Sequence, residues 1–458
     1  MNVAFSMTID PDGAMHDWVD APPGVTLVRV PTQEAVTLLG FRAYQELLVE
    51  LCAAERVGLL VTHPPYDYLD EPTAERLRAG GTRILGYAFD DEIFADKYGA
   101  GTRAALARVY DRYVTTREVP WATAPLPAIP ERQAEHDVVL VGRAYARRAA
   151  LVERLRAAGV NVVVKGAGWE SGVIPRAQML DLYARAAVVL TTADWENWSV
   201  PMIKHRLLDT AMLGAFQIAQ AAPDLRRYFP EEEVPSFADP EELVEKIEVA
   251  LADPQRRRAA ARAARERALR EHTWAARWPI LVGDLPIAEA DATAGRSRLL
   301  DQLLLALGSR AEADGRTPAA AALFGELLAR VPDEPAAAAG LGRCLRDLGR
   351  TSEAIGPLRI AAAARPPVCL AALAVGIPQS GVGTGFGRLS LTPPAAEPLC
   401  FLIASLVELG RDDEALAVAR DLTDPVLVDA VTSGLGGDLP PELKDVLAER
   451  METIRAGR

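Results

Sequence analysis

The sequence has few of the residues that form disulfides, bind zinc or bind nucleic acids. Four cysteines, Cys52, Cys344, Cys369 and Cys400, are scattered over 458 residues without a Cys-x-x-Cys pair. This spacing predicts neither a disulfide framework nor a zinc site, and it fits reduced thiols in a cytoplasmic protein. The chain has 63 acidic and 50 basic residues, a net charge of −13, so it lacks the excess of positive charge that a nucleic-acid-binding protein uses.

Long apolar runs are also missing. No stretch reaches the ~20 apolar residues of a membrane span, and the first residues do not form a basic segment followed by an apolar one. We therefore expect a cytoplasmic protein without a membrane span. Half of the residues are hydrophobic and a quarter are charged, which is typical of globular domains, and the length suits about three of them.

Two successive α/β patterns occupy the first two thirds of the chain. Short apolar runs alternate with amphipathic stretches, which is typical of βαβ units around a parallel sheet. A proline-rich passage with Pro120, Pro125, Pro127 and Pro130 separates the two patterns. We predict a first Rossmann-like domain over 1–125 and a second over 126–290. The expected strands are 3–7, 26–30, 58–62, 83–87, 112–116, 138–141, 161–165, 187–191 and 215–218, and the expected helices are 34–55, 102–109, 147–158, 177–186, 203–213, 241–252 and 255–271.

From 291 to 458 the pattern becomes helical and repeats after about 34 residues, the period of tetratricopeptide repeats. Leu307-Gly308 and Phe324 return as Leu341-Gly342 and Leu358. The turn Gly315-Arg316-Thr317 returns at 349–351, and a weaker third copy starts at Gly410-Arg411. A glycine-rich stretch at 375–387 interrupts the array and lacks the lysine of a phosphate-binding loop, so we interpret it as a flexible insertion.

Four segments carry a resemblance to a known family: 81–91, which ends in an aromatic residue and two acids, 137–145 with a glycine turn, 166–169, and 206–216 with a basic residue, an acid three positions on and a glycine turn. Over about residues 47–273 the chain resembles the CgeB-like glycosyltransferases, often called spore maturation proteins. The resemblance implies two tandem Rossmann-like domains of GT-B type, here followed by an all-α tetratricopeptide-like domain. It also implies a UDP-, GDP- or TDP-sugar as donor and no required metal or cofactor.

Candidate donor-binding residues lie where strands of the second domain are expected to end, which is where ligands bind in open α/β sheets, and on the helix expected at 203–213. Glycine lets a backbone approach a phosphate, and cations stabilise the diphosphate that leaves. Asp209 would bind ribose hydroxyls, although the family usually has Glu there, and Pro201 replaces an acid that some relatives carry. The candidates are Gly142, Arg143, Tyr145, Arg147, Lys165, Gly166, Gly168, Trp169, Lys204, His205, Arg206 and Asp209.

Candidate catalytic residues follow expected strands of the first domain. Asp90 and Asp91 could supply a general base for the acceptor hydroxyl, and His63 could do the same. A helix cap or surface position for the two acids, and a structural histidine, are the alternatives to a catalytic role.

The acceptor is unknown, and a polypeptide docked on the helical repeats is one interpretation; the other is that the repeats cap the enzyme or form a homo-oligomer. A nucleotide-sugar epimerase and a non-catalytic interaction scaffold are the alternative functions.

Overall fold

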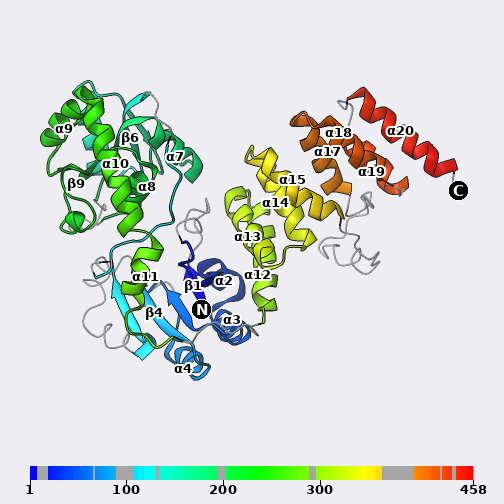
Figure 1. Cartoon of the computed structure of the whole chain (residues 1–458), viewed down its shortest axis with the longest axis horizontal. Coiled ribbons are helices and arrows are strands. Elements are labelled where there is room, and N and C mark those ends of the chain that lie inside the picture. Colours follow the sequence, from blue (N-terminus) through cyan, green and yellow to red (C-terminus); the bar gives the residue numbers. More distant parts are fainter. Residues whose placement is uncertain are drawn as a thin grey trace, which may run out of the picture. The chain divides into compact units, whose positions relative to one another are not determined.

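The computed structural model describes residues 1–7, 19–64, 68–88, 108–116, 118–129, 134–193, 203–287, 295–363, 396–422, 425–435 and 440–456. The chain forms two compact units, Met1–Leu300 and Asp301–Arg458 (Figure 1). The first contains two parallel sheets with their helices, and the second is helical. The expected fold class, two Rossmann-like α/β regions followed by helical repeats, is confirmed.

The first sheet is entirely parallel, with the order β2-β1-β3-β4-β5. Helices cover both of its faces, as alternate residues of β1 show: the Phe5 ring lies edge-on to Trp274 at 5.3 Å, whereas Ser6 Oγ bonds to Thr32 and Tyr44 on the other side. The elements are β1 (Asn2–Met7), β2 (Thr26–Pro31), α2 (Thr32–Leu39), α3 (Phe41–Ala54), β3 (Leu59–Thr62), α4 (Glu71–Ala79), β4 (Arg83–Ala88) and β5 (Arg112–Thr115).

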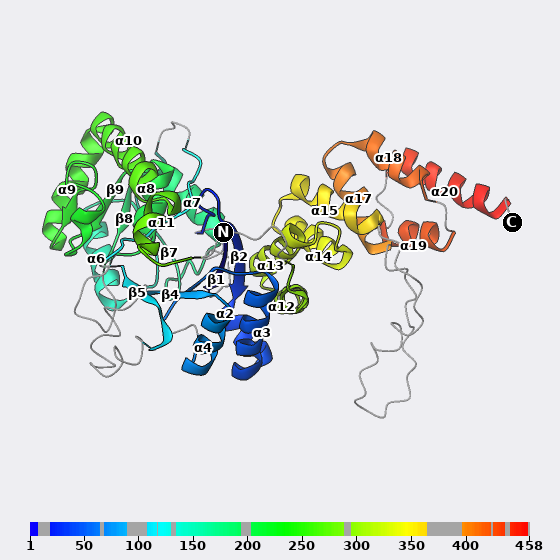
Figure 2. The same ribbon diagram turned by 60° about the horizontal axis from the view of Figure 1, so that its bottom comes forward.

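The second sheet is also parallel, in the order β10-β9-β8-β6-β7. Its strands β7, β8 and β9 are labelled in Figure 2. Its central strands are buried on both faces, which explains their unbroken apolar sequences, such as Val138-Val139-Leu140 at 0–1% exposure. The elements are β6 (His136–Val141), α6 (Ala146–Ala157), β7 (Val162–Lys165), α7 (Arg176–Ala184), β8 (Ala186–Thr191), α8 (Arg206–Leu213), β9 (Gln217–Gln220), the short helix η1 (Leu225–Arg227), β10 (Ser236–Phe237), α9 (Pro240–Ala252), α10 (Pro254–Glu271) and α11 (Trp274–Val282).

Both sheets share one topology, in which the first strand of each is paired on its two sides by the second and the third strand. The chain therefore leaves in opposite directions from the carboxyl ends of β1 and β3, and again from those of β6 and β8. In open α/β sheets, ligands bind in the crevice at this reversal.

Three predicted elements differ from the structure. The single helix expected at 34–55 is two helices, because Gly40 adopts φ 82°, a left-handed conformation that ends α2 before α3 begins. Helix α8 starts at Arg206 rather than at 203. Strand β9 spans Gln217–Gln220, two residues later than expected. Of the helix predicted at 102–109, residues 102–107 lie outside the described part of the chain.

Helix α11 returns the chain to the core of the first sheet. Trp274, Trp278 and Leu281 pack with Phe5 and Tyr87 in one buried cluster. The first domain is thus completed by residues that follow the second, while the boundaries of 125 and 290 stay predictions.

The second unit is a series of packed helices with a recurring turn. Gly315, Gly349 and Gly410 have φ of 71°, 72° and 68°, and the next residue, an arginine each time, donates its backbone N–H to a carbonyl five positions earlier at 2.8 Å. The helices are α12 (Arg298–Ala313), α13 (Thr317–Arg330), α14 (Pro335–Asp347), α15 (Thr351–Ala363), α17 (Ala396–Glu408), α18 (Asp412–Arg420), α19 (Pro425–Leu435) and α20 (Pro441–Ala456).

The predicted packing positions of the repeats also recur in space. A Cβ on Gly308 would lie 2.6 Å from the ring of Phe324, and one on Gly342 would lie 2.5 Å from Leu358. The two pairs are equivalent in the repeat, so the spacing is confirmed by contacts. The predicted insertion at 375–387 lies outside the described residues.

Candidate functional site

The loop after β6 and the loop after β7 are held together at the carboxyl edge of the second sheet. The Gly142 N–H donates to Lys165 O at 2.8 Å, and the indole N–H of Trp169 donates to Gly142 O at 2.8 Å. Ala144 N–H donates to Ala167 O, also at 2.8 Å. Three predicted residues, Gly142, Lys165 and Trp169, are thus joined by hydrogen bonds, two of them through the backbone and Trp169 through its indole.

Gly166 must be glycine for this network to form. Its φ is 131°, and a Cβ on it would lie 2.3 Å from the carbonyl oxygen of Gly142. Gly168 is exposed and has a φ of 85°. A Cβ on Gly168 would lie 3.2 Å from the Cβ of Ala144. The two loops therefore approach each other more closely than side chains would allow.

Two guanidinium groups meet at Gly142. A Cβ on this residue would lie 2.8 Å from Arg148 Nη1 and 3.2 Å from Arg206 Nη2, so both cations flank one point at the end of β6. Adjacent like charges repel each other, and a bound anion would offset that repulsion. Because β6 lies at the reversal of the chain, the pair stands where the topology predicts a ligand.

The two arginines are held differently. Arg148 is 2% exposed, donates from Nη1 to Arg143 O at 2.7 Å and lies over the ring of Tyr145 at 5.1 Å. Arg206 is half-buried in the first turn of α8, and within the described ranges its guanidinium has no hydrogen bond or ion pair to the protein. One cation is fixed in place, and the other is open to a ligand.

Asp209 lies one turn further along α8 and is 1% exposed. Its Oδ1 accepts a hydrogen bond from Arg176 Nη2 at 2.8 Å, and its Oδ2 lies 3.6 Å from His205 Nδ1. Burial raises the pKa of the Asp209 carboxyl, but His205 and Arg176 outweigh it and leave the pKa below its usual value. The predicted ribose ligand is thus an ionised carboxylate already engaged with two side chains of the protein.

The remaining predicted donor residues follow β6, begin α6 or precede α8. Arg143 and Arg147 are exposed, and Tyr145 and Lys204 are half-buried. Tyr183 of α7 is fully buried behind the site, and burial raises the pKa of its hydroxyl well above the usual range. Its proton is therefore retained at neutral pH.

At the first sheet, the structure describes one of the three predicted catalytic residues. His63 follows β3 at the reversal between β1 and β3, and its Nδ1 lies 3.3 Å from Tyr87 O. Since a carbonyl oxygen only accepts, Nδ1 is the donor in this contact, and the neutral ring carries its lone pair on Nε2. Asp90 and Asp91 lie outside the described residues.

Sequence reasoning did not include Arg148 and Arg176 among the site residues. Arg148 shares a helical face with Val152 and Leu155, both buried, whereas Arg147 points to solvent. That spacing of four and seven residues was the available signal. Arg176 lies 33 residues from Asp209, and no local pattern connects the two.

Among the described residues, no group of three or more His, Cys, Asp or Glu side chains is arranged to hold a metal ion. Cys52, Cys344 and Cys400 are free thiols. Within the same ranges, no helix is long and apolar enough to cross a membrane.

Two parts of the chain match known families. Residues 147–282, which include Arg148, Arg206 and Asp209, match a family described as glycosyl transferase-like. Residues 311–373 match the tetratricopeptide repeat. The second α/β region is thus similar to glycosyl transferases, and the helical unit contains tetratricopeptide repeats. No curated protein matches the chain in sequence.

Solved structures similar to the chain include sucrose-phosphate synthase from Thermosynechococcus elongatus, with 16% identity, a TM-score of 0.40, and coverage of 60% of this chain and 95% of that one. HepE from Anabaena in complex with UDP-glucose has 12% identity and a TM-score of 0.41, with 62% and 99% covered. BGT of phage T4 with UDP-glucose has 11% identity and a TM-score of 0.36, with 62% and 100% covered.

Proposed function

We propose that the chain is a GT-B glycosyltransferase of the CgeB-like kind, which moves a sugar from a UDP-, GDP- or TDP-sugar to an acceptor. The single observation that carries the proposal is the meeting of the Arg148 and Arg206 guanidinium groups at Gly142, at the topological reversal of the second sheet. The match of residues 147–282 to a glycosyl transferase-like family supports it.

The chemistry of sugar transfer requires charge stabilisation at this edge. An acceptor hydroxyl attacks the anomeric carbon, the bond from that carbon to the diphosphate oxygen breaks, and the diphosphate leaves with the electron pair. Arg148 and Arg206 would stabilise the negative charge that develops on the leaving group, as preorganised cations do. Arg143, Arg147, Lys165 and Lys204 would add positive charge around the same loops, and no metal ion is needed in this scheme.

The glycine loops and α8 would position the donor. Gly142 and Gly166 let the two loops pack closely, the exposed Gly168 leaves its backbone accessible, and Trp169 fixes the carbonyl of Gly142. Asp209 would reach the ribose with the lone pairs that Arg176 leaves open, because an ionised carboxylate accepts about four hydrogen bonds. His205 would hold the second oxygen of that carboxylate in place.

The proton of the acceptor hydroxyl would pass to a base on the first sheet. His63 would supply an imidazole for this purpose, and Asp90 or Asp91 would supply a carboxylate. The helical domain from 291 to 458 would bind a polypeptide acceptor, since tetratricopeptide arrays present extended surfaces for binding.

The proposal is tested by incubating the purified chain with a panel of nucleotide sugars and analysing the products. We expect release of nucleoside diphosphate from one donor, with a loss of at least tenfold in Arg148→Ala and in Arg206→Ala. Arg154→Ala is the matched control, because Arg154 lies on the same helix as Arg148, and is exposed and paired with Glu241 at 3.0 Å. An epimerised sugar still attached to its nucleotide would show an epimerase instead. If no donor were bound or consumed, the α/β region would be a non-catalytic scaffold.

A further inference from the structure

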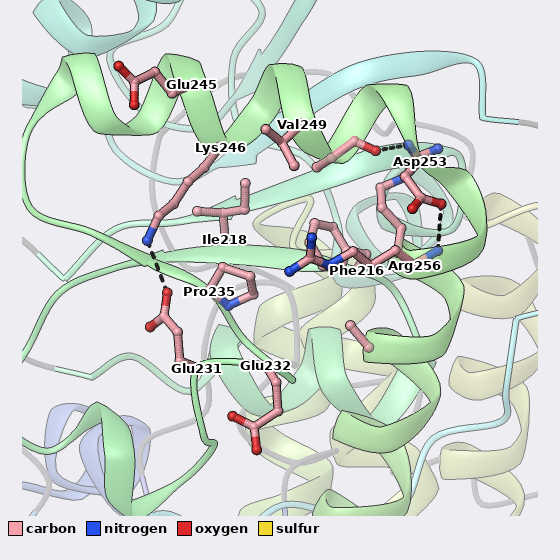
Figure 3. Close-up of a pocket in the computed structure, with 13 residues that line it drawn as sticks. Phe216, Ile218, Glu231, Glu232, Pro235, Glu245, Lys246, Val249, Asp253 and Arg256 are labelled. Carbon is pink, nitrogen blue, oxygen red and sulfur yellow. Dashed lines mark hydrogen bonds and ion pairs between the residues drawn. The ribbon is translucent and has the colours of Figure 1, made fainter.

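A cavity of about 470 Å³ is lined by α9, the first turn of α10, β9 and the loop at 231–235. Figure 3 shows the residues that line it. Some of its charged groups have partners within the chain. Lys246 Nζ lies 3.0 Å from Glu231 Oε1, and Asp253 Oδ1 accepts the backbone N–H of Arg256 at 2.9 Å. Four acidic and three basic side chains line the cavity, so it has no surplus of positive charge for a phosphate.

A larger groove of about 900 Å³ adjoins it, sharing Phe216 and Arg257. The groove runs along the amino ends of β6, β8 and β9, where Asp137, Ala186 and Ala215 line it. It thus lies at the edge of the sheet opposite to Gly142, the carboxyl end of β6. The groove is a separate feature from the proposed donor site.

Arg258 and Arg262 form one wall of the groove. They are four residues apart on α10, so they lie on one helical face, and both are exposed. Within the described ranges, neither side chain makes a hydrogen bond or ion pair. Two exposed arginines therefore lie one turn apart on this face of α10.

Arg257 and Arg265 lie deeper in the same groove. Arg257 donates to Ala250 O, and Arg265 donates to Leu126 O at 3.0 Å, so each is anchored on a neutral carbonyl. Burial lowers the pKa of both groups, and in Arg257 the charge of Arg258 adds to this. Asp253 and Asp137 act on the pKa of Arg257 in the opposite direction, whereas the pKa of Arg265 is affected by burial alone.

Arg258 and Arg262 have no ion pair among the described residues, although the exposed Glu266 lies one turn after Arg262 on α10. Further along the same helix, Arg267 pairs with Glu233 at 2.8 Å and Arg270 pairs with Glu271 at 2.7 Å. The groove has four arginines and Asp137 as its one lining acid, in a chain whose net charge is −13. Within the part of the chain that the structure describes, these four arginines form no ion pair, and a bound anion could supply the missing charge.

We propose that this groove binds a small organic phosphate, with the phosphate between Arg258 and Arg262. Planar guanidinium groups match phosphate oxygens in pairs, and a volume of 900 Å³ falls within the ~300–1,000 Å³ of small-molecule sites. An apolar part of the ligand would lie over Ile129, Phe216 and Leu251, which line the groove and are half-buried. This site does not depend on the proposed transferase function.

The test is a calorimetric titration of the full chain with 1-naphthyl phosphate, which carries an apolar body and a phosphate but no sugar or nucleoside. We expect one molecule to bind and the double variant Arg258→Ala/Arg262→Ala to bind at least tenfold more weakly. Arg270→Ala, on the same helix but outside the groove, is the matched control and should bind as the wild type does. Both replaced residues are exposed, so the melting temperature of the double variant should stay unchanged.

Several results would overturn the site. The first is no binding of 1-naphthyl phosphate, and the second is equal binding by the double variant. The third is equally tight binding of inorganic phosphate, which lacks the apolar ring, or of 1-naphthol, which lacks the phosphate. Loss of binding in Arg206→Ala with retention in the double variant would place the probe at the donor edge instead. Failure of the groove would leave the donor assays untouched, so the two proposals fail separately.

Discussion

Gly166 has room for a hydrogen atom and nothing larger. Because a Cβ there would lie 2.3 Å from the backbone oxygen of Gly142, Gly166→Ala must displace one of the two loops at the end of β6 and β7. We expect donor binding to weaken at least tenfold and the free energy of unfolding to fall by about 2 kcal/mol, the cost of a strained backbone.

The matched control for this change is Gly159→Ala. Gly159 also has a positive φ, 82°, but no atom lies within 4 Å of its Cβ position. It should lose about 1 kcal/mol of stability and keep donor binding, as measured by denaturant unfolding and calorimetry. Equal donor binding in Gly166→Ala and wild type would contradict the role of the glycine contact.

At the residue scale, the sequence predicted those parts of the site that depend on local spacing. Gly142, Gly166 and Arg206 follow strands or begin a helix, so their placement at one sheet edge could be inferred. The engagement of Asp209 with Arg176 could not, because it joins residues 33 positions apart through the packing of α7 on α8. Helical periodicity was enough to predict that Arg148 is buried and that Arg147 is exposed.

At the scale of elements, the join between α10 and α11 contains a neutral histidine. His272 is fully buried; its Nε2 donates to Tyr228 O at 2.9 Å and its Nδ1 accepts from Arg277 Nη2 at 2.6 Å. Burial lowers the pKa of His272 from 6.5 to about 4. Protonation would place a second cation against Arg277.

This histidine makes stability depend on pH. Between pH 6.5 and 4 the unfolded chain binds a proton that the folded chain does not, so the stabilisation is complete above 6.5 and is lost as pH falls towards 4. We expect a loss of about 3 kcal/mol from this residue across the window, measured by denaturant unfolding at several pH values. In His272→Asn this part of the slope should disappear, and an unchanged slope would contradict the assignment.

The helical repeats make an element-scale prediction as well. Gly342→Ala would place its Cβ 2.5 Å from Leu358, so we expect a loss of about 2 kcal/mol through overpacking between α14 and α15. Gly325→Ala, in α13 with no atom within 4 Å of the Cβ position, should gain about 0.5 kcal/mol because alanine favours helix. Thermal unfolding measures both, and equal effects would contradict the repeat packing.

Element existence was more predictable than element bounds. The central strands of both sheets, such as β3 and β8, are buried apolar runs, and such runs are visible in the sequence. The break at Gly40 inside a continuous amphipathic pattern was not inferred, although glycine is the residue that permits it. The return of α11 to the first sheet depends on the contacts of Trp274 and Trp278 with distant strands, which no local pattern contains.

For the whole molecule, the division at Leu300 predicts that the α/β unit binds donor without the helices. The cut should follow Leu300, because Ser297 Oγ donates to Glu50 at 2.5 Å and Ser297 N donates to Glu55 at 3.0 Å. Residues 1–300 should match the full chain in donor affinity within about twofold.

The same truncated chain tests acceptor docking. Lost transfer to a polypeptide with donor hydrolysis retained would support acceptor docking on the repeats, whereas unchanged transfer would contradict it.

The central claim is that the edge formed by β6 and α8 holds the diphosphate of a nucleotide sugar. Its most direct test is a calorimetric titration of UDP-, GDP- and TDP-sugars into the wild type, Arg206→Ala and the exposed control Arg154→Ala. We expect one donor to bind to the wild type and to Arg154→Ala with equal affinity and at least tenfold more weakly to Arg206→Ala. Equal binding in all three proteins, or no binding of any donor, would contradict it.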